Sequence, residues 1–115
     1  MSEPSVNGDP IRQNCALDRV FKLLAGEWMP QVIWTLGTNG PTRFNDLQRL
    51  VEGISPKVLT ERLRLLEAEQ VVGRHQEPTV PPKVTYSLTA KGQSLHESFK
   101  VMEKSASDWF DEDRT

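Results

Sequence analysis

Three polar side chains recur on one face of a helix that is predicted to run from Ser55 to about Glu67. Lys57, Thr60 and Arg64 are three and four residues apart, so a cation, a hydroxyl and a guanidinium share one side of the helix. A guanidinium can donate two hydrogen bonds to guanine, and threonine can contact a thymine methyl group or a base edge. The face fits the DNA major groove, but an ordinary solvated helix face has the same composition.

The start of this helix is specified by its first two residues. Ser55 can accept a hydrogen bond from an amide of the first turn, and Pro56 stands where a missing N–H has no cost. Leu59, Leu63 and Leu66 form the opposite, apolar stripe. Because free amides and partial positive charge gather at a helix N-terminus, Ser55 and Pro56 are expected to approach a DNA phosphate.

The preceding segment predicts a partner for this helix. A helix from Arg43 to Val51 leads through Gly53 into the helix that starts at Ser55. Two short helices joined by a glycine-containing turn form a helix-turn-helix, although a plain helical hairpin in a bundle has the same pattern. Arg43 is expected to hold the DNA backbone. Two earlier helices are predicted, one capped by Asn14 and ending at Gly26, the other spanning residues 28–36.

Strand periodicity follows the helix that starts at Ser55. Residues 71–76 are predicted to form one strand, and residues 83–88 a second one in which apolar and polar side chains alternate. Three prolines in residues 78–82 exclude that segment from a central sheet. The result is a two-stranded hairpin that must pack on helices and would form a wing. Lys83 and Thr85 of this wing are expected at the flanking minor groove or its phosphates.

The last helix is predicted to be capped by Thr89 and to end near Phe110. Its apolar residues recur at spacings of four, three, four and three: Leu95, Phe99, Met102, Ala106 and Trp109. Two interpretations stay open for this stripe. It either closes the core of its own domain or is covered by a partner chain.

Length and charge set the outer limits. A chain of 115 residues forms one domain, here expected over residues 14–110, between a flexible arm at 1–13 and an acidic tail at 111–115. The net charge is -2, but residues 43–92 hold 8 Lys/Arg and 6 Asp/Glu. The middle of the chain is therefore mildly basic, which permits a basic face without demonstrating one.

Several classes of function are disfavoured. His75 and His96 stand apart from each other and from Cys15, so no metal site is predicted, and both histidines are expected on the surface. Neither a nucleophile motif nor a phosphate-binding loop is found, so no enzyme activity and no cofactor are predicted. No apolar run reaches the ~20 residues of a membrane span, and the polar N-terminus lacks a signal sequence. The expected location is the cytoplasm.

Separate sequence blocks in a fixed order resemble the HxlR family of bacterial winged-helix transcriptional regulators. These blocks are Gly26–Trp28, Arg43–Leu47, Ile54–Leu63 and Pro81–Thr89. The resemblance implies a mostly α fold with a small β-hairpin, which is an α+β winged helix-turn-helix. It implies sequence-specific binding to a two-fold operator in double-stranded DNA, with repression or activation of nearby genes. The rival interpretation is a winged-helix module that binds proteins and has lost DNA binding.

The resemblance also implies a homodimer built from the first and last helices. Leu17 and Phe21 of the first helix would join the stripe from Leu95 to Trp109 in that interface. Some members of the family sense quinones, aldehydes or oxidants through a cysteine near the position of Cys15. Here Cys15 is expected at the first position of the first helix, where the helix dipole favours a thiolate. A buried, inert thiol is the alternative.

Three positions depart from the family pattern. Ala16 replaces a proline, and Glu27 replaces the lysine that usually precedes Trp28, which puts a phosphate contact there in doubt. Gln70 replaces the glycine that usually ends the recognition helix. If that residue is left-handed, glutamine strains the backbone by about 1 kcal/mol.

Overall fold

The computed structural model describes residues 15–111, which fold into five helices and one small sheet. The predicted arm at 1–13, the predicted cap Asn14 and most of the predicted tail lie outside the described residues. In chain order, the elements are α1 (Ala16–Leu24), α2 (Met29–Asn39), β1 (Thr42–Arg43), α3 (Phe44–Leu50), α4 (Pro56–Ala68), β2 (Val72–Glu77), β3 (Lys83–Leu88) and α5 (Ala90–Trp109).

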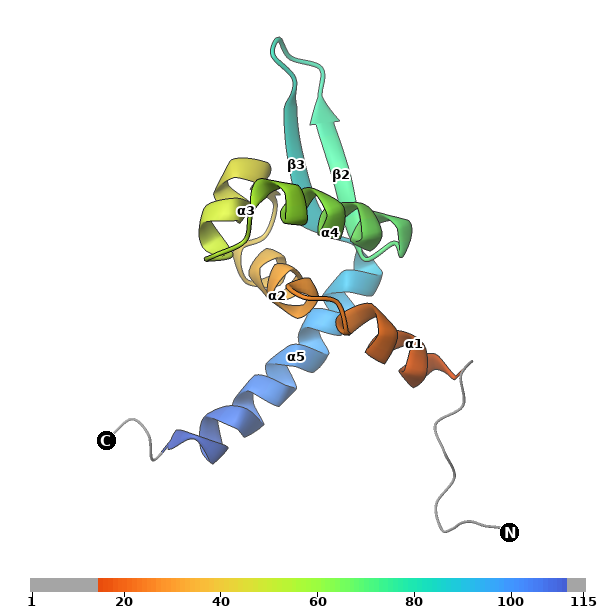
Figure 1. The fold of residues 1–115 in the computed structure, drawn as a ribbon, viewed down its shortest axis with the longest axis vertical. Helices are drawn as coiled ribbons and strands as arrows, with labels where there is room; N and C mark the ends of the chain where they lie inside the picture. Colours follow the sequence, from red (N-terminus) through yellow and green to blue (C-terminus); the bar gives the residue numbers. More distant parts are fainter. Residues whose placement is uncertain (1–14, 112–115) are drawn as a thin grey trace.

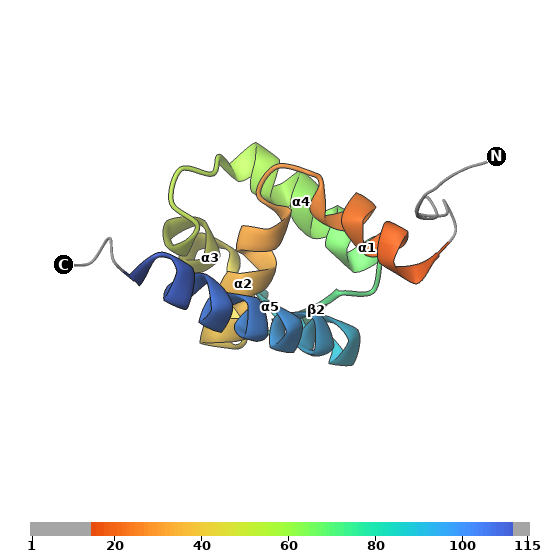
Figure 2. The same cartoon turned by 90° about the horizontal axis from the view of Figure 1, so that it is seen from below.

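The helices are arranged around α2, which lies at the centre of the molecule (Figure 1). Helices α3 and α4 lie on one side of α2 together with the hairpin of β2 and β3, whose tip extends beyond α4 (Figure 1). Helices α1 and α5 lie on the other side and diverge from each other, and the end-on view also keeps them apart (Figures 1 and 2). The polar helix face and the apolar terminal helices are therefore at opposite ends of the domain.

The sheet has three antiparallel strands in the order β1-β3-β2, so the prediction of a two-stranded hairpin was incomplete. The extra strand is the two-residue β1, in which Thr42 pairs with Tyr86 and Arg43 pairs with Thr85. Strands of two residues carry no periodicity, so no sequence pattern announces them. Strand β1 fastens the base of the hairpin to the start of α3.

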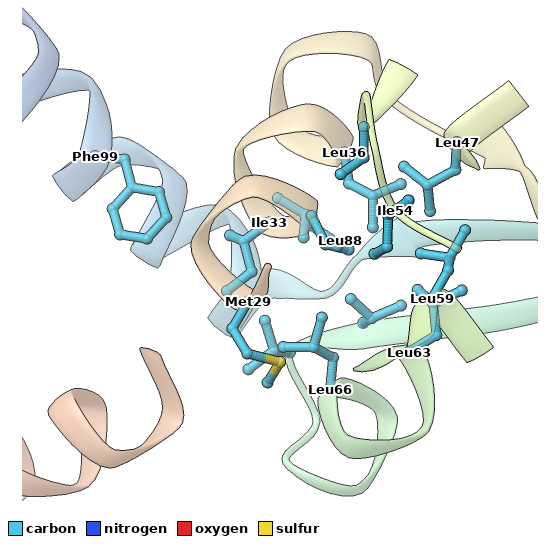
Figure 3. Packing of buried hydrophobic residues seen from close by; sticks show 14 residues of the cluster. Met29, Ile33, Leu36, Leu47, Ile54, Leu59, Leu63, Leu66, Leu88 and Phe99 are labelled. Carbon is cyan, nitrogen blue, oxygen red and sulfur yellow. The ribbon is translucent and has the colours of Figure 1, made fainter. Parts of the chain in front are cut away.

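One apolar core holds the elements together. The side chains of α2, α3 and α4 meet there with Ile54 and Leu88, and Phe99 of α5 lies at one end of the cluster (Figure 3). Leu59, Leu63 and Leu66 are all buried, which confirms the predicted inward stripe of α4. The sequence pattern also places Leu50 on the inward side of the helix predicted over Arg43–Val51. Leu50 is instead 50% exposed, because α3 ends at this residue and Leu47 and Val51 fill the adjoining core.

Three helix starts differ from the prediction by one residue, since α3 begins at Phe44 with Arg43 as its N-cap. Cys15 is the N-cap of α1 rather than its first residue, and its sulfur accepts a hydrogen bond from the Asp18 amide at 3.3 Å. Trp28 is the N-cap of α2 and has a φ of 74°, so the helix begins at Met29. Pro30 lies in the first turn of α2, as the prediction required.

His96 contradicts the expectation of a surface histidine. It is buried between α5 and α2, with its ring 4.9 Å from that of Trp34. The close approach depends on Gly37 of α2, where an added Cβ would lie 2.2 Å from the ring of His96. Its Nε2 has no hydrogen-bond partner within residues 15–111. Helix α5 therefore docks through Gly92, His96 and Phe99, so the buried face shares Phe99 with the predicted stripe but also includes His96 beside it.

Candidate nucleic-acid interface

Helix α4 begins as the sequence predicts. The Ser55 hydroxyl oxygen accepts a hydrogen bond from the Val58 amide at 3.1 Å, and Pro56 is in the first turn. Both residues are exposed, so the remaining free amides of this first turn face solvent. The helix N-terminus is therefore available to an anion, and its starting point is fixed by the cap.

The outward face of α4 carries the predicted polar groups. Lys57 and Arg64 are exposed, as is Glu61, which lies between them on the same face. Thr60 is half-buried, and its hydroxyl donates a hydrogen bond to the Pro56 carbonyl oxygen at 2.8 Å. The hydroxyl proton of Thr60 is thus used inside the helix, which leaves its methyl group and an acceptor oxygen for a ligand.

The other side of α4 is fixed by contacts to distant segments. Arg62 donates a hydrogen bond from Nε to the Glu27 carbonyl oxygen at 2.8 Å, which fixes the helix to the turn before α2. Because Arg62 borders the apolar stripe of α4, its position in the sequence favours a structural ion pair over a DNA contact. Its role is structural, but its partner is a backbone carbonyl rather than a carboxylate. The backbone of Glu27, and not its side chain, therefore supports the helix.

The C-terminal end of α4 is joined to the start of α5. Gln70 has a φ of 61°, which confirms the left-handed conformation considered for this position. The Thr89 hydroxyl donates a hydrogen bond to the Gln70 carbonyl oxygen at 2.6 Å, and its oxygen accepts one from the Gly92 amide. Lys91 adds a hydrogen bond from Nζ to the Glu69 carbonyl oxygen at 2.7 Å. The middle of α4 and its C-terminal end are therefore both held to other elements.

The sheet brings two of the predicted contact residues together. Arg43 is the N-cap of α3, and it stands directly opposite Thr85 in the β1–β3 register. Lys83 begins β3 and faces Glu77 across the hairpin. Arg43 and Lys83 are exposed, and Thr85 is half-buried. The strand β1, which the sequence did not reveal, is what places Arg43 next to the wing.

The predicted cations are not engaged by acidic side chains. Within residues 15–111, Arg43, Lys57, Arg64 and Lys83 take part in none of the ion pairs. Arg49 on α3 differs, since its guanidinium is paired with Asp46 one turn away. Among residues 15–111, no ion pair would have to break before these four cations of α3, α4 and the wing meet an anion.

The predicted dimer residues fall into two groups. Phe99 is 7% exposed and Leu95 packs against the core, so both close their own subunit. Met102 is 57% exposed and Trp109 is 70% exposed, while Ala106 is half-buried. In α1, Leu17 and Phe21 are exposed, and the helix contains no buried residue at all. The apolar surface left uncovered thus belongs to α1 and to the C-terminal half of α5.

A groove of about 480 Å³ lies beside this uncovered surface. Its walls come from α2, the end of α3 and the C-terminal half of α5, and they include Trp34, Leu50, Phe99 and Met102. Glu52 and Glu103 also contribute to its lining. The groove is mainly apolar, which is typical of a surface that another chain or ligand covers.

Other kinds of site find little support in the described part of the chain. No group of three or more His, Cys, Asp or Glu residues is placed to hold a metal ion within residues 15–111. None of the helices in the same range is both long enough and apolar enough to cross a membrane. Cys15 is half-buried.

The arrangement as a whole defines a class. A helix-turn-helix of α3 and α4 is flanked by a three-stranded sheet whose hairpin extends past the second helix (Figure 1). This architecture is the winged helix-turn-helix, and residues 23–114 match a protein family described as HxlR-like helix-turn-helix. The chain belongs to this family of transcriptional regulators.

Individual relatives agree with this assignment. The HTH-type transcriptional regulator sll1512 of Synechocystis is 36% identical over 110 residues, which cover 93% of this chain and 81% of that protein. The reduced form of the regulator YodB from Bacillus subtilis superimposes with a TM-score of 0.72 at 37% identity, over 81% of this chain and 91% of that one. The diamide-treated form of YodB from Bacillus subtilis superimposes with a TM-score of 0.68 at 35% identity, over 86% of this chain and 97% of that one.

Proposed function

We propose that this protein binds double-stranded DNA sequence-specifically, as a homodimer, and thereby represses or activates transcription. The observation that carries the proposal is the division of α4 into two faces. Leu59, Leu63 and Leu66 are buried, the middle and the C-terminal end of the helix are fixed by hydrogen bonds to other elements, and its outward face bears exposed cations. A rigid, polar, cationic helix face is what reading of base edges requires. A DNA target and the family of transcriptional regulators support a location in the bacterial cytoplasm.

Each residue has a distinct role in the proposal. Arg64 forms the bidentate contact to guanine, and Thr60 contacts a thymine methyl group or a base edge. Lys57 takes either of these two roles. Ser55 and Pro56 bring the free amides of the first turn to a phosphate, since the serine oxygen itself is used as the cap. Glu61, between the cations, accepts from a cytosine amino group in the matched sequence.

The wing and the start of α3 act on the backbone. Arg43 contacts a phosphate at the edge of the major groove. Lys83 and Thr85 contact the flanking minor groove or its phosphates. These groups contribute affinity that varies with salt, because each phosphate neutralised releases condensed counterions.

Dimerisation is proposed through the uncovered apolar surface of α1 and α5. Leu17 and Phe21 of one copy would pack against the groove between α2, α3 and α5 of the other, which contains Trp34 and Met102. This arrangement would cover an amphipathic helix that has no buried residue in its own subunit. Two α4 helices related by a two-fold axis would then read half-sites about 34 Å apart.

The dimer is tested by a charged substitution in the groove. Met102→Glu should shift the protein from dimer to monomer in light scattering over a concentration series, because a carboxylate would be buried without a partner. Val101→Glu is the matched control, since Val101 is 68% exposed on the same helix and points away from the groove residues. Equal oligomeric states for the two variants would contradict this interface.

DNA binding is tested by gel shift on the segment upstream of the protein's own gene at two salt concentrations. Site-selective binding that weakens as salt rises supports the proposal. Absence of binding at the lower salt concentration would instead support the rival function, a winged-helix module for protein contacts. Competition with an unrelated duplex separates specific from nonspecific binding.

Regulation through Cys15 is proposed as a part of this function. Its sulfur caps α1, a helix that has no buried residue in its own subunit. Alkylation or oxidation would remove the cap and disturb the dimer contact of α1. The test treats the protein with methylglyoxal or diamide, follows Cys15 by mass spectrometry and measures DNA binding in parallel. Cys15→Ser is the control, and unchanged binding by a fully modified protein would remove the idea.

A further inference from the structure

A second pocket, of about 330 Å³, lies between α1 and the C-terminal end of α4. Helix α1 contributes Arg19, Lys22 and Leu23 to its lining, and α4 contributes Leu65 and the C-cap residue Glu69. Sites for small molecules span about 300–1,000 Å³, so this pocket has the size of a site for a small metabolite. None of these five residues takes part in the proposed reading of DNA.

Helix geometry separates the pocket from the proposed dimer contact. A helix has about 3.6 residues per turn, so the side of α1 that carries Arg19 and Lys22 is turned away from the side that carries Leu17 and Phe21. The surface that Leu17 and Phe21 would give to a partner is therefore not the surface that lines the pocket.

The inner part of the pocket is apolar. Met29, at the start of α2, also lines it and is 3% exposed, and Leu23 is half-buried against the core. Leu65 is 49% exposed, although its helix neighbours on the outward face of α4 are charged. A ligand with an apolar part would cover this leucine and remove its side chain from water.

The charged residues of the pocket are of opposite sign and are not paired with each other. Lys22 already forms an ion pair with Asp18, at 3.1 Å. Arg19 and Glu69 are exposed, and within residues 15–111 neither belongs to an ion pair, although both line the same pocket. A small molecule that carries both an anion and a cation matches this arrangement, because it can bond to both groups at once.

We propose that this pocket binds a free α-amino acid with an apolar side chain. The ligand carboxylate would accept hydrogen bonds from Arg19, and the ligand ammonium would donate to Glu69. Its side chain would lie against Met29 and Leu65. Such a ligand would join α1 to α4, and its effect on DNA affinity rests on the proposed function, whereas binding of the ligand does not.

Ligand analogues that each lack one group test the charge pattern. Thermal melting is followed over concentration series of L-leucine, L-methionine and L-phenylalanine, and ligand binding should raise the melting temperature. Leucinamide lacks the carboxylate and N-acetyl-leucine lacks the ammonium, so each should bind about tenfold or more weakly than leucine. Equal shifts from leucine and both analogues, or no shift from any of the three amino acids, would overturn the proposal.

Two substitutions assign the two charges of the ligand to residues. Arg19→Gln should weaken leucine binding about tenfold or more and bind leucine no better than leucinamide. Glu69→Gln should likewise bind leucine no better than N-acetyl-leucine, and it keeps the carbonyl oxygen that Lys91 contacts. Glu67→Gln is the matched control on α4, outside the pocket lining, and should bind leucine like the parent. Parental affinity in both pocket variants would overturn the site.

The link between α1 and α4 is tested on DNA. Fluorescence anisotropy with the upstream segment, with and without saturating leucine, should show a severalfold change in affinity that Arg19→Gln abolishes. An unchanged affinity in the presence of bound leucine would overturn the link. If the parent protein binds leucine but no duplex, the proposed function fails while the amino-acid site stands.

Discussion

Helices α4 and α5 carry similar apolar repeats, but they use them differently. In α4, Leu59, Leu63 and Leu66 are all buried inside the subunit, and only polar groups remain on the exposed face apart from Leu65 at its edge. In α5, burial stops at Phe99, and Met102 and Trp109 are exposed beyond it. The C-terminal half of α5 extends past the body of the domain (Figures 1 and 2).

The difference shows how one small domain prepares two kinds of surface. A helix whose apolar side is covered by its own chain has a fixed position in the domain. Its outer side can then carry charged groups without exposing apolar surface. A helix that continues past the core keeps apolar area uncovered, which favours association with another chain. The separation of the two surfaces by α2 allows each to be changed without altering the other.

The largest expected effect is a loss of stability, caused by a substitution in the buried leucine stripe of α4. Leu63→Ala should lower the free energy of unfolding by about 2–5 kcal/mol, because it leaves a cavity at a fully packed site. Urea denaturation at several protein concentrations measures it. The loss should be independent of concentration for Leu63→Ala, whereas Met102→Ala should change mainly the concentration dependence. The reverse result would mean that the two helices have the same role.

A substitution at the joint between α2 and α5 should have the next largest effect. Gly37→Ala should destabilise the protein by about 1–3 kcal/mol, because the new methyl group meets the ring of His96. Thermal unfolding monitors the change. Combining Gly37→Ala with His96→Ala should cost less than the sum of the two single changes. Strict additivity would show that the close approach does not constrain α5.

The polar face of α4 is tested by removing its guanidinium. Arg64→Ala should weaken operator binding by about 1–3 kcal/mol and relax the preference at one base pair. Lys83→Ala, on the wing, should instead weaken binding to all duplexes alike and reduce the salt slope. Affinity measurements with single-base variants of the bound segment distinguish the two. Parental binding by both variants would show that the docking geometry is wrong.

The smallest effect is expected where α4 ends and α5 begins. Gln70→Gly should stabilise the protein by about 0.5–1 kcal/mol, since glycine adopts the observed positive φ without strain. Guanidinium denaturation would detect the change. Glu69→Gly, one residue earlier and with a φ of -85°, is the control and should not stabilise. Stabilisation by both variants would point to a cause other than backbone conformation.

Local signals were enough to predict α4 and its surroundings. A serine cap, a proline in the first turn and leucines at helical spacing all act within one helix, so they are legible in sequence. The alternation in residues 83–88 likewise located β3 and the wing. The outward residues Lys57, Thr60 and Arg64 followed, because the outward face of a capped amphipathic helix is determined once its inward face is known.

What could not be predicted depends on contacts between distant segments. The burial of His96 requires Gly37 on another helix, and nothing near His96 in sequence indicates it. Strand β1 exists only because β3 offers an edge. Arg43 and His75 both stand opposite Thr85, one on each side of β3, and this arrangement follows only from the register of all three strands. The apolar repeat of α5 showed how much surface needs cover, but not which part its own subunit provides.

The loop at the tip of the hairpin is a segment whose length can change without altering the rest of the fold. The last paired residues are Glu77 and Lys83, so residues 78–82 belong to neither strand, and Val80 is fully exposed. Doubling the length of such a loop costs only about 0.6 kcal/mol in closure entropy. Under the proposed DNA binding, insertions there would lengthen the contact with flanking DNA while the residues proposed to read bases keep their positions. Descendants of one ancestral regulator could thus acquire different operator lengths through changes confined to five residues.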